Sequence, residues 1–341
     1  MRLSRRRLNR TLLRRQHLLE RVDLPPSVMA AHLIGLQAQE SLAPYLSLAA
    51  RLAPFDPYAV TACLEAGRLV RLATLRGTLH LHEAADALAV RAWVQASLDQ
   101  QVRGRVQVDD DVLRAAVHEA LSDAPMEHER LSETLAARFP GSGSELVVVA
   151  RTLLPLVQLP PRGTWRGAGG IVWDHLERVA GAAPTPIDVE QVIRRYLRAF
   201  GPATAADLAV WSGVTRLRPV LTRMPDLVRH EDQDGKALFD VHDAPIEDED
   251  ATAPVRLLGR YDNVWLAHAG RDRVTEVGTR GNWMGANGGV AMTVFVDGWL
   301  TGLWRVAEAR VEIIDLFRRL SPVERDELDE EIARVEALLA R

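Results

Sequence analysis

The apolar side chains of the first eighty residues change from helical to strand-like spacing. Near-helical spacing, broken by proline and glycine, predicts helices over Leu3–Leu19, Pro25–Leu36, Leu42–Leu52 and Asp56–Ala66. Residues Arg68–His82 then alternate apolar and polar side chains across a glycine, which predicts a β-hairpin. Helices followed by a hairpin are the element order of a winged helix-turn-helix.

This order recurs twice along the chain. The second set of predicted elements comprises three helices and a hairpin with a Gly-rich turn: Asp111–Leu121, Leu131–Phe139, Glu145–Leu156 and Val157–Trp173. The third set follows a linker at Gly181–Pro186 and comprises three helices and two strands: Val189–Phe200, Thr204–Ser212, Thr215–Leu221, Leu227–His230 and Ala237–Val241.

The remaining residues are β-rich. Val255–Ala267, Gly289–Val296 and Gly298–Ile314 read as strands with glycine turns, and Ser321 and Pro322 open a final amphipathic helix. We therefore predict an α+β, mainly helical fold with three tandem winged helix-turn-helix units and a C-terminal β-rich domain. The expected boundaries are 1–100, 101–180, 181–250 and 251–341.

Composition excludes several classes of protein. At 341 residues, with 47% hydrophobic and 26% charged residues, the chain has the composition of a soluble protein of more than one domain. The longest charge-free run, Gly281–Val296, is Gly-rich and shorter than a bilayer span. The single cysteine, Cys63, cannot form an internal disulfide or a cysteine-based zinc site. These features lead us to expect a cytoplasmic protein without a membrane segment.

Charge is distributed unevenly along the chain. Its net charge of −4 argues against a nucleic-acid partner, but residues 1–21 hold eight arginines and one glutamate, a net +7. Residues 231–250 hold nine acids and one lysine, a net −8. We expect the basic segment, including Arg5, Arg6 and Arg7, to border a duplex-binding surface and the acidic segment to face away. Winged helices also bind proteins, so topology alone leaves the partner open.

Two glutamines interrupt the first unit. Residues two apart on a helix point about 200° apart, so Gln37 and Gln39 can converge on one ligand only from an extended or helix-end backbone. As bare residues, they also fit ordinary solvated positions. His80 and His82 share a strand face, but no third ligand is evident, so we predict no metal and a wing that touches DNA or core. No nucleotide-cofactor motif is visible, and we predict no cofactor.

Five segments, in consistent order over nearly the whole chain, together resemble the bacterial tandem winged-helix DNA glycosylases: Leu33–Tyr45, Arg76–His80, Leu159–Trp165, Phe200–Gly213 and Asp297–Trp304. That family includes enzymes of azinomycin self-resistance and enzymes that unhook interstrand crosslinks. Its signature of glutamine, an apolar residue, then glutamine or aspartate matches Gln37-Ala38-Gln39.

The resemblance implies that Gln37 and Gln39 are catalytic and that Arg76, Thr78 and His80 lie beside the site and contact DNA. A late block, Arg260–Arg271, also resembles the family but has Gly270 where an aspartate is common.

The implied chemistry suits these side chains. An N7-alkylguanine carries a positive charge and leaves readily, so the enzyme must orient a water and stabilise an oxocarbenium-like sugar. A neutral amide can do both without a permanent charge. A lyase would need an amine, and the only lysine, Lys236, lies in the acidic segment.

We therefore expect a monomeric, monofunctional glycosylase acting on double-stranded DNA with cationic N7-alkylpurines, bulky adducts or crosslinks, in DNA repair or self-resistance to a genotoxin. A non-catalytic tandem winged-helix DNA-binding protein, such as a transcription regulator, is the alternative.

Overall fold

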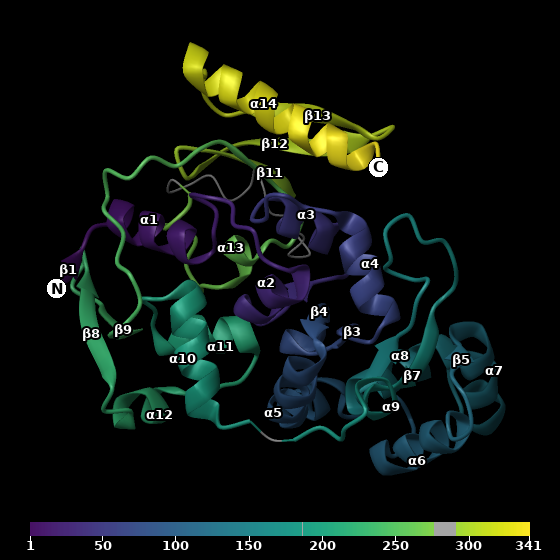
Figure 1. Ribbon diagram of the computed structural model, residues 1–341. Coiled ribbons are helices and arrows are strands. Elements are labelled where there is room, and N and C mark those ends of the chain that lie inside the picture. The colour runs from purple at the N-terminus through teal and green to yellow at the C-terminus, as the bar shows by residue number, and fades with distance from the viewer. Residues whose placement is uncertain (186, 276–290) are drawn as a thin grey trace.

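The computed structural model describes residues 1–185, 187–275 and 291–341, whose helices and strands form a mixed α+β architecture (Figure 1). These residues build three sheets, with strand orders β1-β8-β9, β10-β11-β12-β13 and β2-β4-β3-β6-β7-β5. Within them, no helix is long and apolar enough to span a bilayer.

Three parts of the chain repeat the order helix, strand, two helices, two strands. The first contains α2 (Pro26–His32), β2 (Leu36–Gln37), α3 (Ala43–Ala49), α4 (Pro57–Glu65), β3 (Leu69–Ala73) and β4 (Leu79–Glu83), with a 3₁₀ turn at Leu75–Gly77. It follows β1 (Arg2–Leu3) and α1 (Arg5–Arg15), and α5 (Ala84–Val102) comes after it. The second contains α6 (Asp110–Ala120), β5 (Met126–Glu127), α7 (His128–Arg138), α8 (Gly143–Leu153), β6 (Leu156–Gln158) and β7 (Val172–His175), then α9 (Leu176–Ala180).

The third repeat contains α10 (Val189–Phe200), α11 (Ala205–Ser212), α12 (Arg218–Arg223), β8 (Leu227–Asp232) and β9 (Ala237–Val241). A single bridge from Ala203 to Phe239 takes the place of its first strand. The C-terminal part contains β10 (Arg256–Leu258), α13 (Asn263–Leu266), β11 (Met292–Val296), β12 (Trp299–Ala307), β13 (Arg310–Leu316) and α14 (Pro322–Leu339). The helix–hairpin order predicted from sequence is therefore present in all three repeats.

The first two repeats share one sheet. β3 pairs antiparallel with β4 in its own repeat and with β6 of the next, so that Leu72 lies opposite both His80 and Val157. Every residue of β3 is buried. The hairpin predicted over residues 68–82 is therefore core rather than an exposed wing.

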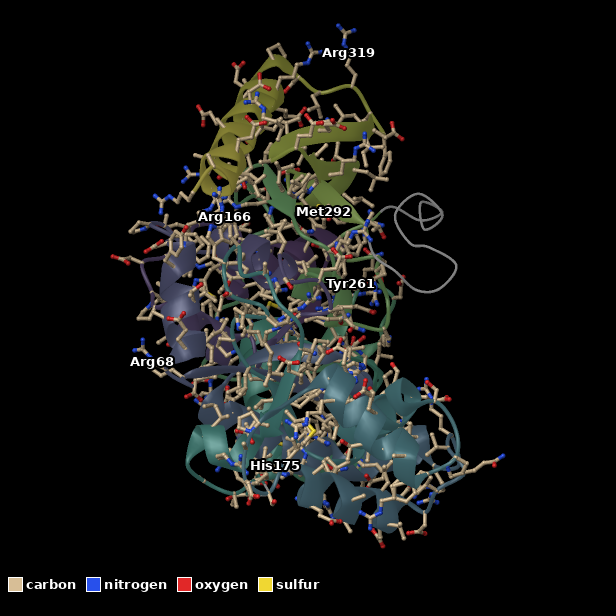
Figure 2. The ribbon with its side chains drawn as sticks, turned by 90° about the vertical axis from the view of Figure 1, so that its right-hand side faces the viewer. Arg68, Arg166, His175, Tyr261, Met292 and Arg319 are labelled. Atoms are coloured by element: carbon tan, nitrogen blue, oxygen red, sulfur yellow. The ribbon has the colours of Figure 1, made fainter. Side chains whose placement is uncertain are left out.

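The C-terminal sheet and α14 lie at the end of the molecule opposite α6 (Figures 1 and 2). Ser321 and Pro322 begin α14, as the sequence predicts, and Ser321 also forms a capping box with Glu324. One buried cluster includes Leu46 of α3, Tyr196 of α10 and Trp304 of β12. The first repeat, the third repeat and the C-terminal sheet therefore pack around a common core.

Several boundaries differ from the sequence prediction. α2 ends at His32 rather than Leu36, because Gly35 has φ +93° and turns the chain into β2. Leu156 begins a strand rather than ending a helix, since Pro155 follows the last turn of α8. The predicted β region over 255–267 contains the helix α13, and α5 was not predicted. Predicted residues 186, 289 and 290 lie outside the described residues.

The basic segment, which we expect to border a duplex, packs against the acidic segment, which we expect to face away from that duplex. β1 pairs parallel with β8, and Arg15 of α1 forms a buried ion pair with Asp240 at 2.8 Å. Arg7 lies 3.9 Å from Asp248, and Arg14 lies 3.6 Å from Glu247. Opposite charges remote in sequence thus neutralise each other inside the chain.

Candidate active site

Gln37 lies in an extended segment at the edge of the six-stranded sheet. It pairs with His80 of β4, and the amide of Ala38 donates to the carbonyl of Leu79 at 2.7 Å. The backbone is therefore extended as far as Ala38, the condition that the sequence set for Gln37 and Gln39 to act together. The Gln37 side chain is 7% exposed, whereas Gln39 is exposed in the bend that follows.

The turn that introduces this segment is shaped by two side chains. A Cβ at Gly35 would lie 2.3 Å from the ring of His82, so only glycine lets the chain pass. From the other side, Asn263 Nδ2 donates to the carbonyls of Gly35 at 3.0 Å and Leu33 at 3.3 Å. Asn263 belongs to the late block, so that block supports the glutamine segment directly.

Arg71 of β3 holds the backbone between the two glutamines. Its Nη2 donates to the carbonyl of Ala38 at 2.8 Å. Burial lowers the pKa of Arg71 to about 10, helped by the nearby Arg162, so the side chain stays cationic at neutral pH. A Cβ at Gly163 would lie 2.2 Å from Arg71 Nη1, so this glycine makes room for the guanidinium. Sequence analysis missed Arg71, although a charge inside Leu69–Ala73 was the available signal.

Arg76 holds the side chain of Gln37. It occupies the turn between β3 and β4 with φ +57°, and its Nη2 donates to Gln37 Oε1 at 3.1 Å. Its Nη1 donates to the carbonyl of Trp211 in α11. Burial lowers the pKa of Arg76 to about 10, with a further contribution from Arg271, which leaves it cationic at neutral pH. A guanidinium only donates, so it fixes which amide atom of Gln37 faces it.

Thr78 and His80 lie on the other side of the same turn. His80 is 2% exposed, and its Nδ1 lies 2.9 Å from the carbonyl of Thr78. A carbonyl only accepts, so Nδ1 carries the proton and Nε2 the lone pair. Burial, Arg76 and His82 hold the pKa of His80 well below its usual range, and the imidazole is neutral at pH 7. The structure brings Gln37, Arg76, Thr78 and His80 together.

His82 is a buried residue of the core beside Gly35. Its Nε2 lies 2.9 Å from Thr74 Oγ1, and burial lowers its pKa to about 4. The rings of His80 and His82 are 5.7 Å apart between centroids. Within the described ranges, no group of three His, Cys, Asp or Glu side chains is arranged to hold a metal ion.

The N-terminal arginines lie on another part of the molecule. Arg6 pairs with Asp297 at 2.8 Å, Arg7 lies near Asp248, and Arg5 stacks over Trp299 at 4.9 Å. The carboxylates beside Arg6 and Arg7 offset their charges. None of these contacts involves Gln37, so the three arginines do not extend the glutamine site, and their role as phosphate contacts stays a prediction.

A hollow of about 620 Å³ lies between α4 and α14 and is lined mainly by apolar residues, including Leu52, Phe55 and Leu338. None of the predicted site residues lines it. The candidate chemistry is therefore at the β2–β4 edge.

Comparison with known proteins identifies the family and the fold. A family model described as DNA glycosylase AlkZ-like matches residues 30–338. An interstrand DNA cross-link repair glycosylase from Streptomyces sahachiroi is 28% identical over 333 residues, covering 88% of this chain and 87% of its own length. The solved structure of the Streptomyces sahachiroi DNA glycosylase AlkZ superposes with a TM-score of 0.79 at 22% identity, covering 100% of this chain and 98% of that one.

Proposed function

The chain belongs to the DNA glycosylase AlkZ-like family, and from that premise we propose that it hydrolyses the N-glycosidic bond of cationic N7-alkylpurines in double-stranded DNA. Bulky adducts and interstrand crosslinks are included in the proposed substrate class, because the Streptomyces relative is named as a cross-link repair glycosylase. The observation that carries the proposal is the Gln37-Ala38-Gln39 segment, in which the Ala38 carbonyl accepts from Arg71 and the Gln37 side chain accepts from Arg76.

The proposed reaction divides the work between the two amides. Water oxygen bonds to the anomeric carbon while the bond to the purine nitrogen breaks, and its electron pair neutralises the cationic base. The proton lost by the water passes to solvent. Because the Gln37 side-chain oxygen already accepts a hydrogen bond from Arg76, the Gln37 amide offers its N–H donors to the substrate. The side-chain oxygen of the exposed Gln39 accepts a hydrogen bond from the water.

This pair supplies no acid to protonate a departing base. The amides do not titrate, and Glu40, the next carboxylate in sequence, is 42% exposed and pairs with Arg260 at 3.4 Å. Unmodified purines, which need protonation to leave, are therefore poor substrates. The charge on an N7-alkylated base removes that need.

We propose that Arg76 acts as a positioning residue through Gln37. Both of its terminal nitrogens donate within the protein, to Gln37 and to the carbonyl of Trp211. Thr78 and His80 support the same turn. We retain the sequence-based proposal that this turn borders the DNA.

The monofunctional assignment rests on the position of Lys236. It lies exposed in the β8–β9 turn, where Asp232 Oδ1 accepts its backbone amide at 2.8 Å. No site residue contacts it, and it is the only lysine of the chain. Without an amine at the sugar, the enzyme leaves an intact abasic strand.

We also propose that each repeat is a winged helix and that the four parts follow the boundaries 1–100, 101–180, 181–250 and 251–341. The repeated order of helix, strand, two helices and two strands supports this assignment. A monomer is proposed because one chain supplies all the residues of the site. Base excision requires access to the chromosome, which supports a cytoplasmic location.

An excision assay tests the function. Duplexes with one N7-methylguanine, and duplexes with an N7-linked interstrand crosslink, should release free base or separated strands under single-turnover conditions. An unmodified duplex is the matched control, and Gln37→Ala is the control for a contaminating activity. Sequence-specific duplex binding without base release would instead support a transcription regulator.

A further inference from the structure

A basic hollow lies on the third repeat, apart from the glutamine segment. It measures about 520 Å³ and is bordered by the start of α11, the exposed side of α12 and the β8–β9 hairpin (Figure 1). Its polar lining comprises Thr204, Arg218, Thr222, Arg229 and Lys236, and its apolar lining comprises Ala205, Ala206, Ala237 and Phe239. Three cationic side chains therefore border one hollow, and its lining within the described part of the chain includes no acidic side chain.

These cations differ from the three arginines of α10 in having no carboxylate partner among the described residues. Among the described residues, Arg218 and Lys236 make no ion pair, and Arg229 only stacks over Phe239 at 5.5 Å. On α10 of the same repeat, by contrast, Arg194 pairs with Asp226 at 2.7 Å. The hollow therefore keeps its positive charge in a chain whose net charge is −4.

The neighbouring acids are used elsewhere or lie toward β1. Asp232 accepts backbone amides of the hairpin turn, from Asp234 at 2.9 Å and Lys236 at 2.8 Å. Glu231 lies two residues beyond Arg229 on the same face of β8, opposite Arg2 of β1. Exposed Arg216 precedes α12, and exposed Arg223 is its last residue.

We infer that this hollow is a phosphate-binding site for the backbone of duplex DNA. Guanidinium and ammonium groups are the side chains that contact phosphate oxygens, and a helix followed by a hairpin is the part of a winged helix that meets a duplex. Contacts of this kind position a protein on DNA and do not read sequence. The inference also gives the only lysine a role as a point charge for phosphate.

The site lies within reach of a duplex engaged at Gln37. α11 begins beside the hollow at Thr204 and ends near Trp211, whose carbonyl accepts from Arg76. Seven helical residues span about 10 Å, which is about three base-pair steps along a duplex. The inference therefore rests on the proposed function in two respects, namely that the third repeat is a winged helix and that DNA lies across the Gln37 segment.

Salt dependence of binding tests the inference. We compare the wild type with the triple variant Arg218→Ala, Arg229→Ala, Lys236→Ala on one undamaged duplex, measuring Kd over a range of salt concentrations. Loss of three phosphate contacts should lower the slope of log K against log salt by about 2.7. The triple variant Arg138→Ala, Arg305→Ala, Arg310→Ala removes the same charge from exposed arginines that pair with glutamates, and it should keep the wild-type slope.

Equal slopes for all three proteins would overturn the inference. If the hollow triple variant does not fold, Lys236→Gln alone should lower the slope by about 0.9, and an unchanged slope in that folded variant would equally overturn it. The proposed function is tested separately, because it would be refuted if the wild type released no base in the excision assay. A lowered slope in the hollow variant supports the phosphate site whichever way the excision assay ends.

Discussion

Arg76 Nη2 lies 3.1 Å from Oε1 of Gln37, and this contact gives the amide one orientation. Gln37 pairs through its backbone with the strand that follows the Arg76 turn, so side chain and backbone are held by the same hairpin. A glutamine free in solution can flip its amide and offer either end. In this site, the N–H end is the one left for a ligand.

Removing either glutamine amide should slow excision far more than it weakens DNA binding. For Gln37→Ala and Gln39→Ala we expect a loss on the order of 10²-fold, about 2.7 kcal/mol, from one preorganised polar contact. If both residues hold one water, the double variant should lose much less than the product of the single losses. Single-turnover rates, measured beside melting temperature and duplex affinity, decide this, and full activity in either folded variant would refute the assignment.

Gln39→Asp should retain substantial excision activity, because the family signature accepts aspartate at this position and a carboxylate can still orient water. Gln39→Asn is the matched control, since it shortens the amide without adding charge. Activity in Gln39→Asn but none in Gln39→Asp would contradict the acceptor role of Gln39. The measurement is again the single-turnover rate on an N7-methylguanine duplex.

Arg76 should act only through Gln37. Arg76→Met in the wild type should reduce the excision rate on the order of 10²-fold, the effect of displacing a catalytic group by about 1 Å. In the Gln37→Ala background the same change should reduce it hardly further. Equal losses in both backgrounds would show that Arg76 contacts the substrate directly.

Gln37→Glu separates stability from activity. A carboxylate keeps the acceptor that faces Arg76 and adds an ion pair, so the melting temperature should not fall below that of Gln37→Ala. It loses both N–H donors, so the excision rate should fall as far as in Gln37→Ala. A fully active Gln37→Glu variant would mean that the donors are not used.

Gly163 tests the support beneath the site. Gly163→Ala adds a Cβ 2.2 Å from the guanidinium of Arg71 and should pull that side chain away from the carbonyl of Ala38. Gly141→Ala is the matched control, because Gly141 also has positive φ but nothing within 4 Å. Both carry the cost of alanine at positive φ, about 1 kcal/mol, and only Gly163→Ala should also slow excision. Equal excision by the two variants would contradict this role of Arg71.

Stability should fall as the pH is lowered through the histidine range. Burial lowers the pKa of His82 to about 4, so the unfolded chain binds a proton at higher pH than the folded chain does. The free energy of unfolding should therefore drop between about pH 6.5 and 4, with His82 contributing on the order of 3 kcal/mol. Urea unfolding of wild type and His82→Asn at pH 7 and pH 5 measures this, and the variant should show the smaller difference. Identical differences would exclude His82 as a source.

The abasic DNA strand should remain uncleaved and should not be covalently bound to the enzyme. Borohydride should not trap a covalent complex on damaged DNA, since trapping requires an amine at the sugar. A gel that resolves free, trapped and nicked strands measures both outcomes. Efficient trapping would overturn the monofunctional assignment.

Local pattern was enough to predict the repeated elements, whereas contacts between distant segments were not. The alternation over 68–82 predicted β3 and β4 because side-chain period is a local property. It did not show that β3 pairs with β6, which depends on how the repeats meet. The charges of residues 1–21 and 231–250 were visible, but their pairing, as in Arg15 with Asp240, is set by the fold.

The same limit applied to the site. The glutamine pair and Arg76 were identified by their resemblance to a family motif. The sequence showed only that the two glutamines need an extended or helix-end backbone to contact one ligand. Arg71 belongs to the strand β3 and donates to the carbonyl of Ala38. Asn263 belongs to α13, more than two hundred residues after the glutamines, and donates to the carbonyl of Gly35. Hydrogen bonds from side chains to backbone carbonyls leave no pattern in the sequence, because every residue has a backbone carbonyl and the sequence does not show which one accepts.

The pairing of β3 with β6 makes the first two repeats mechanically one piece. The angle between them cannot change unless the hydrogen bonds between Arg71, Leu72 and their partners in β6 are broken. An enzyme built this way does not close around its substrate by hinging at that boundary. Where the first two repeats and a duplex differ in shape, bending of the DNA is one way to fit them, and lesions that soften the helix would lower the elastic cost of that bending.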